Sequence, residues 1–298
     1  MSPGAKRAGY RVAVASGDEQ AGSRGHRPRA LIVTLYGLYA RELGGWLSVA
    51  SIIQLMVELG VDEAAVRSSI SRLKRRNILV AERVDGVAGY SLSDEARVIL
   101  DEGDRRIFER RRATPDEGWV LAVFSVPETE RDKRHQLRSR LSWLGFGTVS
   151  AGVWIAPAHL HDEARDALAR DGLAAYVDLF EGGYKGFGDI RDQVPNWWDL
   201  IRLQQLYREF SNHYTPMLAR YRRRKVVPPR HAFADYVDAL TNWRRLPYSD
   251  PGLPLEVLPS GWQGVRAAET FFELQRLLAD PAHAFVTKTI TTGRSRTA

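Results

Sequence analysis

The chain of 298 residues contains no cysteine, which excludes disulfide bonds, thiol catalysis and cysteine-ligated zinc sites. It has no apolar run long enough to span a membrane, and its N-terminal residues lack the apolar segment of a signal peptide. It also lacks a glycine-rich nucleotide fingerprint and a Ser/His/Asp arrangement, and its 7 histidines are scattered. These absences predict a cytoplasmic protein that is not an enzyme, holds no metal or cofactor and does not associate with membranes.

The composition is that of a globular protein with a basic bias. Hydrophobic residues make up 44% of the chain and charged residues 27%, and the length suits two or three domains. A net charge of +7 favours polyanionic partners. Charge alone does not distinguish DNA from RNA or from a phosphorylated ligand.

Residues 60–76 have the pattern of a short amphipathic helix. Asp62 is a suitable N-cap, and the basic residues at positions 74–76 suit the electronegative C-terminal end. At about 100° per residue, one face carries Val66, Ile70 and Leu73. The opposite face carries hydroxyl and guanidinium groups, which are suited to reading a DNA major groove. A solvated surface helix is the alternative for this segment alone.

The flanking segments favour DNA binding. Helical patterns cover residues 28–42 and 48–59, with Ser48 as N-cap of the second helix and Gly60 at its end. Residues 78–84 predict a strand, Asp85-Gly86 a hairpin turn and residues 89–92 the returning strand. This order predicts a winged helix-turn-helix that binds double-stranded DNA. The expected DNA-binding residues are Arg67, Ser68, Ser71, Arg72, Lys74, Arg75 and Arg83.

The middle of the chain predicts a linker helix and a small α/β domain. A helix begins near Ser93 and runs into the basic residues 110–112, which are interpreted as solvated linker charge or, alternatively, as phosphate contacts. From residue 119, apolar runs and helical patterns alternate in the order β-α-β-β-α-β, which is that of a ferredoxin-like domain.

The C-terminal third predicts a mostly helical domain. A glycine-dense stretch at residues 181–188 is either a plain loop or a place where backbone N–H groups approach phosphates. Helical patterns follow from Trp197, from about Arg230, and in a last helix that ends near Phe285. Between the last two helices, three prolines and a tryptophan predict a rigid extended segment.

Several motifs resemble those of the PaaX family of bacterial repressors of phenylacetic-acid catabolism. They are P-R-A-L-I-V-T-L-Y-G at 28–37, A-V-R-S-S-I-S-R-L at 65–73, W-L-G-F-G at 143–147, G-V-W-I at 152–155, D-P-G-L-P at 250–254 and L-P-S-G-W-Q-G at 258–264. The resemblance covers residues 28–285. It implies a dimeric repressor that binds a palindromic operator and is released by an aryl-acyl-CoA such as phenylacetyl-CoA.

An acyl-CoA effector requires cations for its phosphates and an apolar slot for its acyl group. Lys185 and Arg191, with Tyr184 and Trp197 nearby, are the candidates. The alternative function is a nucleic-acid-binding or metal-dependent nuclease module without effector control, because the family's central domain resembles small CRISPR-associated nucleases. The corner at 126–128 offers Glu128 but no aspartate before Asp132, which disfavours a nuclease.

The expected architecture is therefore α+β and multidomain. Its expected parts are a disordered tail (1–27), a winged-helix domain (28–92), a linker helix (93–116), a ferredoxin-like domain (117–182), a helical C-terminal domain (183–285) and a flexible tail (286–298).

Overall fold

The computed structural model describes residues 28–295, so the expected tail at 1–27 and the last residues lie outside the described part. The described chain forms two compact units. We call residues 28–104, 210–244 and 266–295 the helix-rich unit, and residues 105–209 and 245–265 the sheet unit. Both units mix helices with a small antiparallel sheet, which confirms the expected α+β class.

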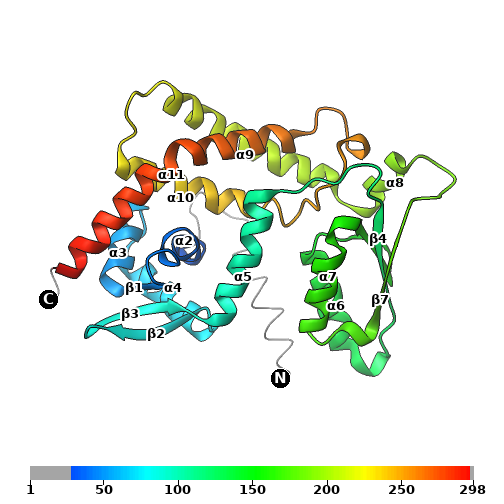
Figure 1. Cartoon of the computed structure of the whole chain (residues 1–298), viewed down its shortest axis with the longest axis horizontal. Helices are drawn as coiled ribbons and strands as arrows, with labels where there is room; N and C mark the ends of the chain where they lie inside the picture. Colours follow the sequence, from blue (N-terminus) through cyan, green and yellow to red (C-terminus); the bar gives the residue numbers. More distant parts are fainter. Residues whose placement is uncertain (1–27, 296–298) are drawn as a thin grey trace. The chain divides into compact units, whose positions relative to one another are not determined.

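The first part of the helix-rich unit combines short helices with a three-stranded sheet (Figure 1). Its elements are helix α2 (Pro28–Leu35), the π-helical turn η1 (Tyr36–Ala40), strand β1 (Trp46–Ser48), helices α3 (Val49–Glu58) and α4 (Glu63–Arg75), and strands β2 (Leu79–Val84) and β3 (Val87–Leu92). The strand order is β1-β3-β2, and both pairings are antiparallel.

Side-chain and glycine caps fix the turn between α3 and α4. The Ser48 hydroxyl accepts from the N–H of Ser51 at 3.0 Å, and the Asp62 carboxylate accepts from that of Ala65 at 2.8 Å. Gly60 has φ +76°, and the N–H groups of residues 60 and 61 bond back to carbonyls of the last turn of α3. This is a Schellman end, which favours glycine because of the left-handed conformation. All three predicted caps are confirmed.

Strand β1 is absent from the sequence-based expectation. It is only three residues long, and it pairs with β3 so that Trp46 lies opposite Ser91. The Trp46 ring covers Gly89, where an added Cβ would lie 2.3 Å from the ring. The predicted hairpin is thus confirmed, with an additional strand attached to it.

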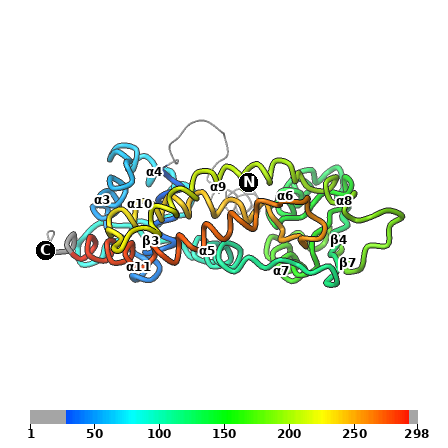
Figure 2. The backbone as a smooth tube through the Cα atoms, turned by 90° about the horizontal axis from the view of Figure 1, so that it is seen from above, coloured from blue at the N-terminus to red at the C-terminus, as the bar shows by residue number. Residues whose placement is uncertain are grey.

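Further helices complete the helix-rich unit. They are α5 (Asp94–Asp104), the second half of α9 (Leu200–Arg222), α10 (Pro229–Trp243) and most of α11 (Gln263–Ser295), and α9 and α11 lie side by side (Figures 1 and 2). Trp243 of α10 stacks on Phe271 of α11 at 4.8 Å between ring centroids. The hydroxyls of Thr34 on α2 and Thr241 on α10 are hydrogen-bonded at 2.9 Å. The first helix and the C-terminal helices therefore share one core.

Helix α11 continues beyond its expected end near residue 285. It runs to Ser295, and Val286 and Ile290 are buried one helical turn apart. Helix α11 therefore includes residues 286–295 of the expected flexible tail, and its apolar side chains give it a packed face as far as Ile290.

The sheet unit is built on a four-stranded antiparallel sheet of order β5-β6-β4-β7. Its elements are the π-helical turn η2 (Arg105–Glu109), β4 (Trp119–Phe124), α6 (Arg131–Trp143), β5 (Gly147–Ser150), β6 (Val153–Pro157), α7 (His161–Arg170), β7 (Val177–Gly182) and α8 (Ile190–Trp197). Short 3-10 turns occur at Glu128–Glu130, Ala158–Leu160, Ala174–Tyr176 and Leu255–Val257. From β4 to β7, strands and longer helices follow the predicted order β-α-β-β-α-β.

Packing around Trp198 involves both glycines of the W-L-G-F-G motif. The Trp198 indole N–H donates to the carbonyl of Gly145 at 2.9 Å, and an added Cβ on Gly147 would lie 2.6 Å from the same ring. A buried ion pair also joins Arg140 to Asp171 at 3.0 Å and links α6 to the end of α7.

Across residues 28–295, no helix combines the length and apolar character that a membrane span requires.

Candidate nucleic-acid interface

Helix α4 has one buried face and one exposed polar face. Val66, Ile70 and Leu73 are buried, as predicted. Ser69 is also buried. The exposed residues are Arg67, Ser68, Ser71, Arg72, Lys74, Arg75 and Arg76. The predicted division of the helix into an inner and an outer face is therefore observed.

The cations on this face differ in whether described residues engage them. Arg67 pairs with Glu63 one turn earlier at 2.7 Å, and Arg76 also has an interaction within the described chain. Within residues 28–295, the structure gives no ion pair to Arg72, Lys74 or Arg75. Their guanidinium and ammonium groups are exposed and therefore available to an external anion.

The hairpin contributes one predicted contact residue. Arg83 lies on β2, is exposed, and donates to the carbonyl of Gly86 in the turn at 2.9 Å. Asp85 and Gly86 both have positive φ, at 51° and 78°, which is the conformation of a tight two-residue hairpin turn. This hydrogen bond holds the Arg83 side chain along the hairpin.

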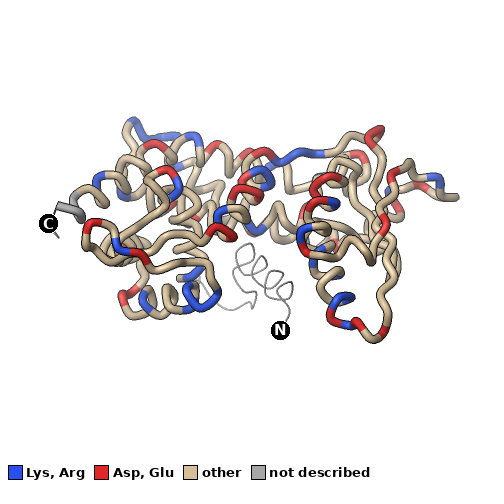
Figure 3. Tube along the Cα trace, turned by 60° about the horizontal axis from the view of Figure 1, so that its bottom comes forward, with Lys and Arg blue, Asp and Glu red and all other residues tan. Residues whose placement is uncertain are grey.

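Basic residues are not confined to this helix. Figure 3 shows Lys and Arg distributed over both units and mixed with acidic residues. The net charge of the chain therefore does not single out a binding face. The case for α4 depends on its local arrangement of unpaired cations and hydroxyls.

The predicted effector residues lie near the start and end of the segment between β7 and α9. The rings of Tyr184 and Trp197 meet edge-on at 6.1 Å, and Trp197 also lies against Trp119 and Trp198. Lys185 and Arg191 are exposed. The two aromatic residues are thus together in a cluster of rings, and both cations face solvent.

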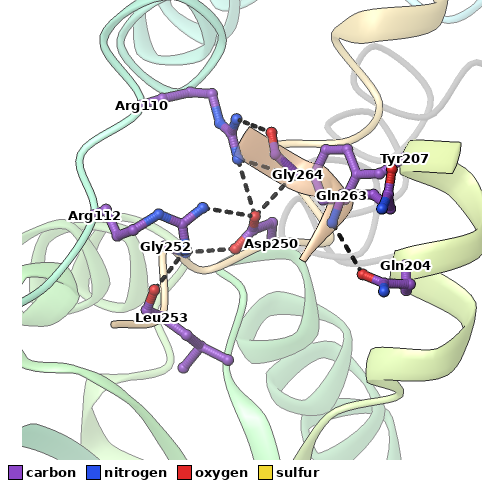
Figure 4. Close-up of polar contacts among 9 residues, drawn as sticks. All are labelled: Arg110, Arg112, Gln204, Tyr207, Asp250, Gly252, Leu253, Gln263 and Gly264. Atoms are coloured by element: carbon purple, nitrogen blue, oxygen red, sulfur yellow. Dashed lines mark hydrogen bonds and ion pairs between the residues drawn. The ribbon is translucent and has the colours of Figure 1, made fainter. Parts of the chain in front are cut away.

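The basic run at 110–112 differs from both of its sequence-based interpretations. Arg110 donates to the Asp250 carboxylate at 3.0 Å, and Arg112 lies 3.6 Å from the same oxygen and donates to the carbonyl of Leu253 (Figure 4). Only Arg111 is exposed, paired with Glu117. Arg110 and Arg112 are therefore structural, because they neutralise a buried carboxylate.

Asp250 is the centre of this polar cluster. Its side chain is 1% exposed, and it accepts from the Tyr207 hydroxyl at 2.8 Å and from the N–H of Gly252 at 2.9 Å. Burial opposes ionisation, but the charges of Arg110 and Arg112 and these two hydrogen bonds hold the pKa of Asp250 below its ordinary value. The cluster joins the segment after η2 to α9 and to the proline-rich segment.

Sequence reasoning missed Asp250 and Tyr207. The available signal was the combination of an arginine run with the D-P-G-L-P motif, but nothing local indicated that segments 140 residues apart are in contact.

Comparison with known proteins relates the chain to family profiles, to one curated relative and to one solved structure. Three family profiles match the chain: "PaaX-like protein" at residues 27–96, "PaaX protein central Cas2-like domain" at 112–194 and "PaaX-like protein C-terminal domain" at 198–288. The chain is 25% identical over 263 residues to "Transcriptional repressor PaaX" of Escherichia coli K12, covering 87% of this chain and 83% of the relative. The solved structure of "Uncharacterized protein Rv0674 from Mycobacterium tuberculosis" is similar in fold, with a TM-score of 0.52 and 22% identity over 85% of this chain and 99% of that one.

The fold and these matches define a multidomain α+β transcriptional regulator, not an enzyme. The chain belongs to the PaaX family of transcriptional repressors.

Proposed function

We propose that the protein is a DNA-binding repressor whose first part is a winged helix-turn-helix and whose helix α4 enters the major groove. The observation that carries the proposal is the exposed face of α4, where Arg72 and Arg75 have no ion pair among the described residues. Guanidinium groups hydrogen-bond guanine edges and phosphates, and serine hydroxyls such as those of Ser68 and Ser71 contact either bases or backbone.

The remaining predicted contacts have supporting roles in this proposal. Lys74 and Arg67 flank the reading face, and Arg83 on the hairpin is suited to a phosphate contact beside the groove. In the sheet unit, the strand order β5-β6-β4-β7 and the alternation of strands and helices favour a ferredoxin-like domain. We propose cytoplasmic action as a homodimer on a double-stranded operator, since DNA-binding dimers recognise paired half-sites.

The proposed effector is an aryl-acyl-CoA that releases the repressor from an operon for phenylacetate-type catabolism. This rests on the resemblance of the sequence motifs to the PaaX family and on the similarity of the chain to a transcriptional repressor of E. coli. Release requires the ligand to bind the DNA-incompetent state more tightly than the competent one. Tyr184, Lys185, Arg191 and Trp197 remain the proposed contacts, with the aromatic pair available to the acyl group.

The test is an affinity measurement on an operator fragment at several salt concentrations. Replacement of Arg72 or Arg75 by alanine is expected to cost about 1–3 kcal/mol if the residue contacts a base, with relaxed specificity at one position. A phosphate contact instead weakens all sequences similarly and lowers the log–log salt slope by about 1. Phenylacetyl-CoA is expected to release the complex.

Arg276→Ala is the matched control, because Arg276 is exposed on α11 in the same unit and pairs with Glu273. Affinity that is unchanged in both α4 variants would refute the assignment of the reading helix. A salt-independent affinity would contradict DNA binding as a whole.

A nuclease without effector control is the second candidate. Glu128 is the carboxylate at the corner 126–128 that follows β4, and Arg134 and Arg131 both pair with it, at 2.9 and 3.5 Å. These ion pairs favour a structural role for Glu128. Metal-dependent cleavage of RNA or DNA would support the nuclease instead.

A further inference from the structure

The sheet unit contains a cavity of about 140 Å³ that the proposed DNA and effector contacts do not include. The segment after α5 and the segment around Asp250 line it together with part of α7. Cavities of roughly this size, about 150 Å³, hold a molecule as large as benzene. The space therefore suits a small group, not an entire nucleotide.

The lining is strongly charged and unbalanced in sign. It includes five arginines, Arg105, Arg106, Arg110, Arg111 and Arg112, against three carboxylates, Glu109, Glu163 and Asp250, which leaves a formal charge of +2 (5 − 3). An excess of guanidinium groups around a small cavity favours an anion, because the planar donor fork matches the oxygens of phosphate and carboxylate.

Three of these arginines are already engaged. Arg106 donates to Glu163 and to the carbonyls of Trp143 and Leu144, with all three distances at 3.0 Å. Arg110 and Arg112 pair with Asp250. These contacts tie the three guanidinium groups to neighbouring residues of the sheet unit, so they help to set the shape of the cavity.

The other two arginines are better placed to bind a ligand. Arg111 is exposed and its pair with Glu117 is a surface ion pair, which contributes little and is readily exchanged. Arg105 is exposed, and the described residues give it no ion pair. Both line the cavity, so an oxyanion there meets guanidinium donors that are not committed to the fold.

His159 adds a second, independent feature. It lines the same cavity, and its Nδ1 is buried with no hydrogen-bond partner among the described residues. Burial, and then the positive charge of Arg111, lower the pKa of His159 to about 4; Arg106 acts in the same direction, and Glu117 and Glu163 oppose it. An anion beside these arginines would offset their charge and favour protonation of the imidazole.

We propose that this cavity is a binding site for the oxyanion head, phosphate or carboxylate, of a small molecule, with Arg105 and Arg111 as the binding cations. The site is independent of DNA binding and of the effector contacts proposed above.

Titration calorimetry and NMR of the full-length protein test the site with three probes: inorganic phosphate, phenyl phosphate and benzoate. Phenol is the neutral control. Saturable binding of at least one anion, weakened about tenfold or more in the Arg105→Ala/Arg111→Ala variant, is expected. The anion that binds identifies the head group. Arg138→Ala, an exposed arginine on α6 outside the cavity, should bind as the wild type does.

The His159 ring supplies a readout that a purely structural role would not affect. With the anion bound, its titration midpoint should move upward, and the His159→Gln variant identifies the resonance. The ring of His135, exposed on α6, should not respond. No binding of any probe at millimolar concentration, or equal binding by the double variant, would overturn the proposal whatever the outcome of the DNA measurements.

Discussion

Replacement of Asp250 by asparagine tests the polar cluster of the sheet unit. Asparagine keeps the shape of the side chain but removes its charge, so Arg110 and Arg112 lose the carboxylate that neutralises them. Removing one partner of a buried ion pair costs about 3–5 kcal/mol. The side chains of Arg110 and Arg112 are 12% and 21% exposed, so partial hydration offsets some of the loss. We therefore expect the lower end of the range, about 3 kcal/mol.

Urea unfolding followed by tryptophan fluorescence measures this loss. Trp262 lies edge-on to Tyr207 at 5.8 Å, so its emission reports on the cluster. With a slope of about 1–3 kcal/mol per molar urea, the midpoint of the transition should fall by roughly 1–3 M. Asp132→Asn is the control, because Asp132 is exposed on α6 and substitutions at such sites change the free energy of unfolding by about 0.5 kcal/mol or less.

The pH dependence provides the decisive comparison. The pKa of Asp250 is lowered in the folded protein, so its stabilisation is fully present above the unfolded pKa of about 3.9 and decreases as the pH falls through the folded value. The difference in the free energy of unfolding between wild type and Asp250→Asn should therefore shrink below about pH 4. Two results would refute the assigned role of the charge: a loss of free energy of unfolding under about 1 kcal/mol at pH 7, or a difference between the two proteins that grows on acidification.

Two further substitutions test local features. Asp62→Ala removes the N-cap of α4 and should lower the free energy of unfolding of the helix-rich unit by about 0.5–2 kcal/mol in urea titration; an unchanged value would contradict the cap. Gly252→Ala should destabilise the sheet unit by more than about 1 kcal/mol, because φ is +73° and the new Cβ would lie 2.3 Å from the carbonyl oxygen of Arg111. Gly188→Ala, with no atom within 4 Å, is its control, and equal thermal midpoints for the two variants would refute the argument.

Local features of the helix-rich unit were predictable because each depends on a few neighbouring residues. The faces of α4 follow from the spacing of Val66, Ile70 and Leu73, and the caps at Ser48 and Asp62 follow from single side chains. Strand β1 was not predictable in the same way. Three residues carry no periodic signal, and only pairing with β3 makes them a strand.

Contacts between distant segments limited the prediction of the sheet unit. The arginines at 110–112 look like linker charge in isolation, because Asp250 is far away in the sequence and becomes a partner only after folding. The end of α11 was missed for a related reason. The sequence of its last turns is mostly polar, and the packing of Val286 and Ile290 is evident only in the folded unit.

The motifs that place the chain in its family separate by burial into two kinds. Asp250, Gly252 and Gly147 are buried, and each has a contact within the sheet unit that accounts for its identity. The motif at residues 65–73 is different, because it alternates buried apolar residues with exposed serines and arginines. Packing explains the first set but leaves the outer face of α4 without a function inside the described chain. Exposed Arg72 has no ion pair among the described residues, and under the proposed function a DNA duplex supplies the phosphates and base edges that its guanidinium group is suited to bind.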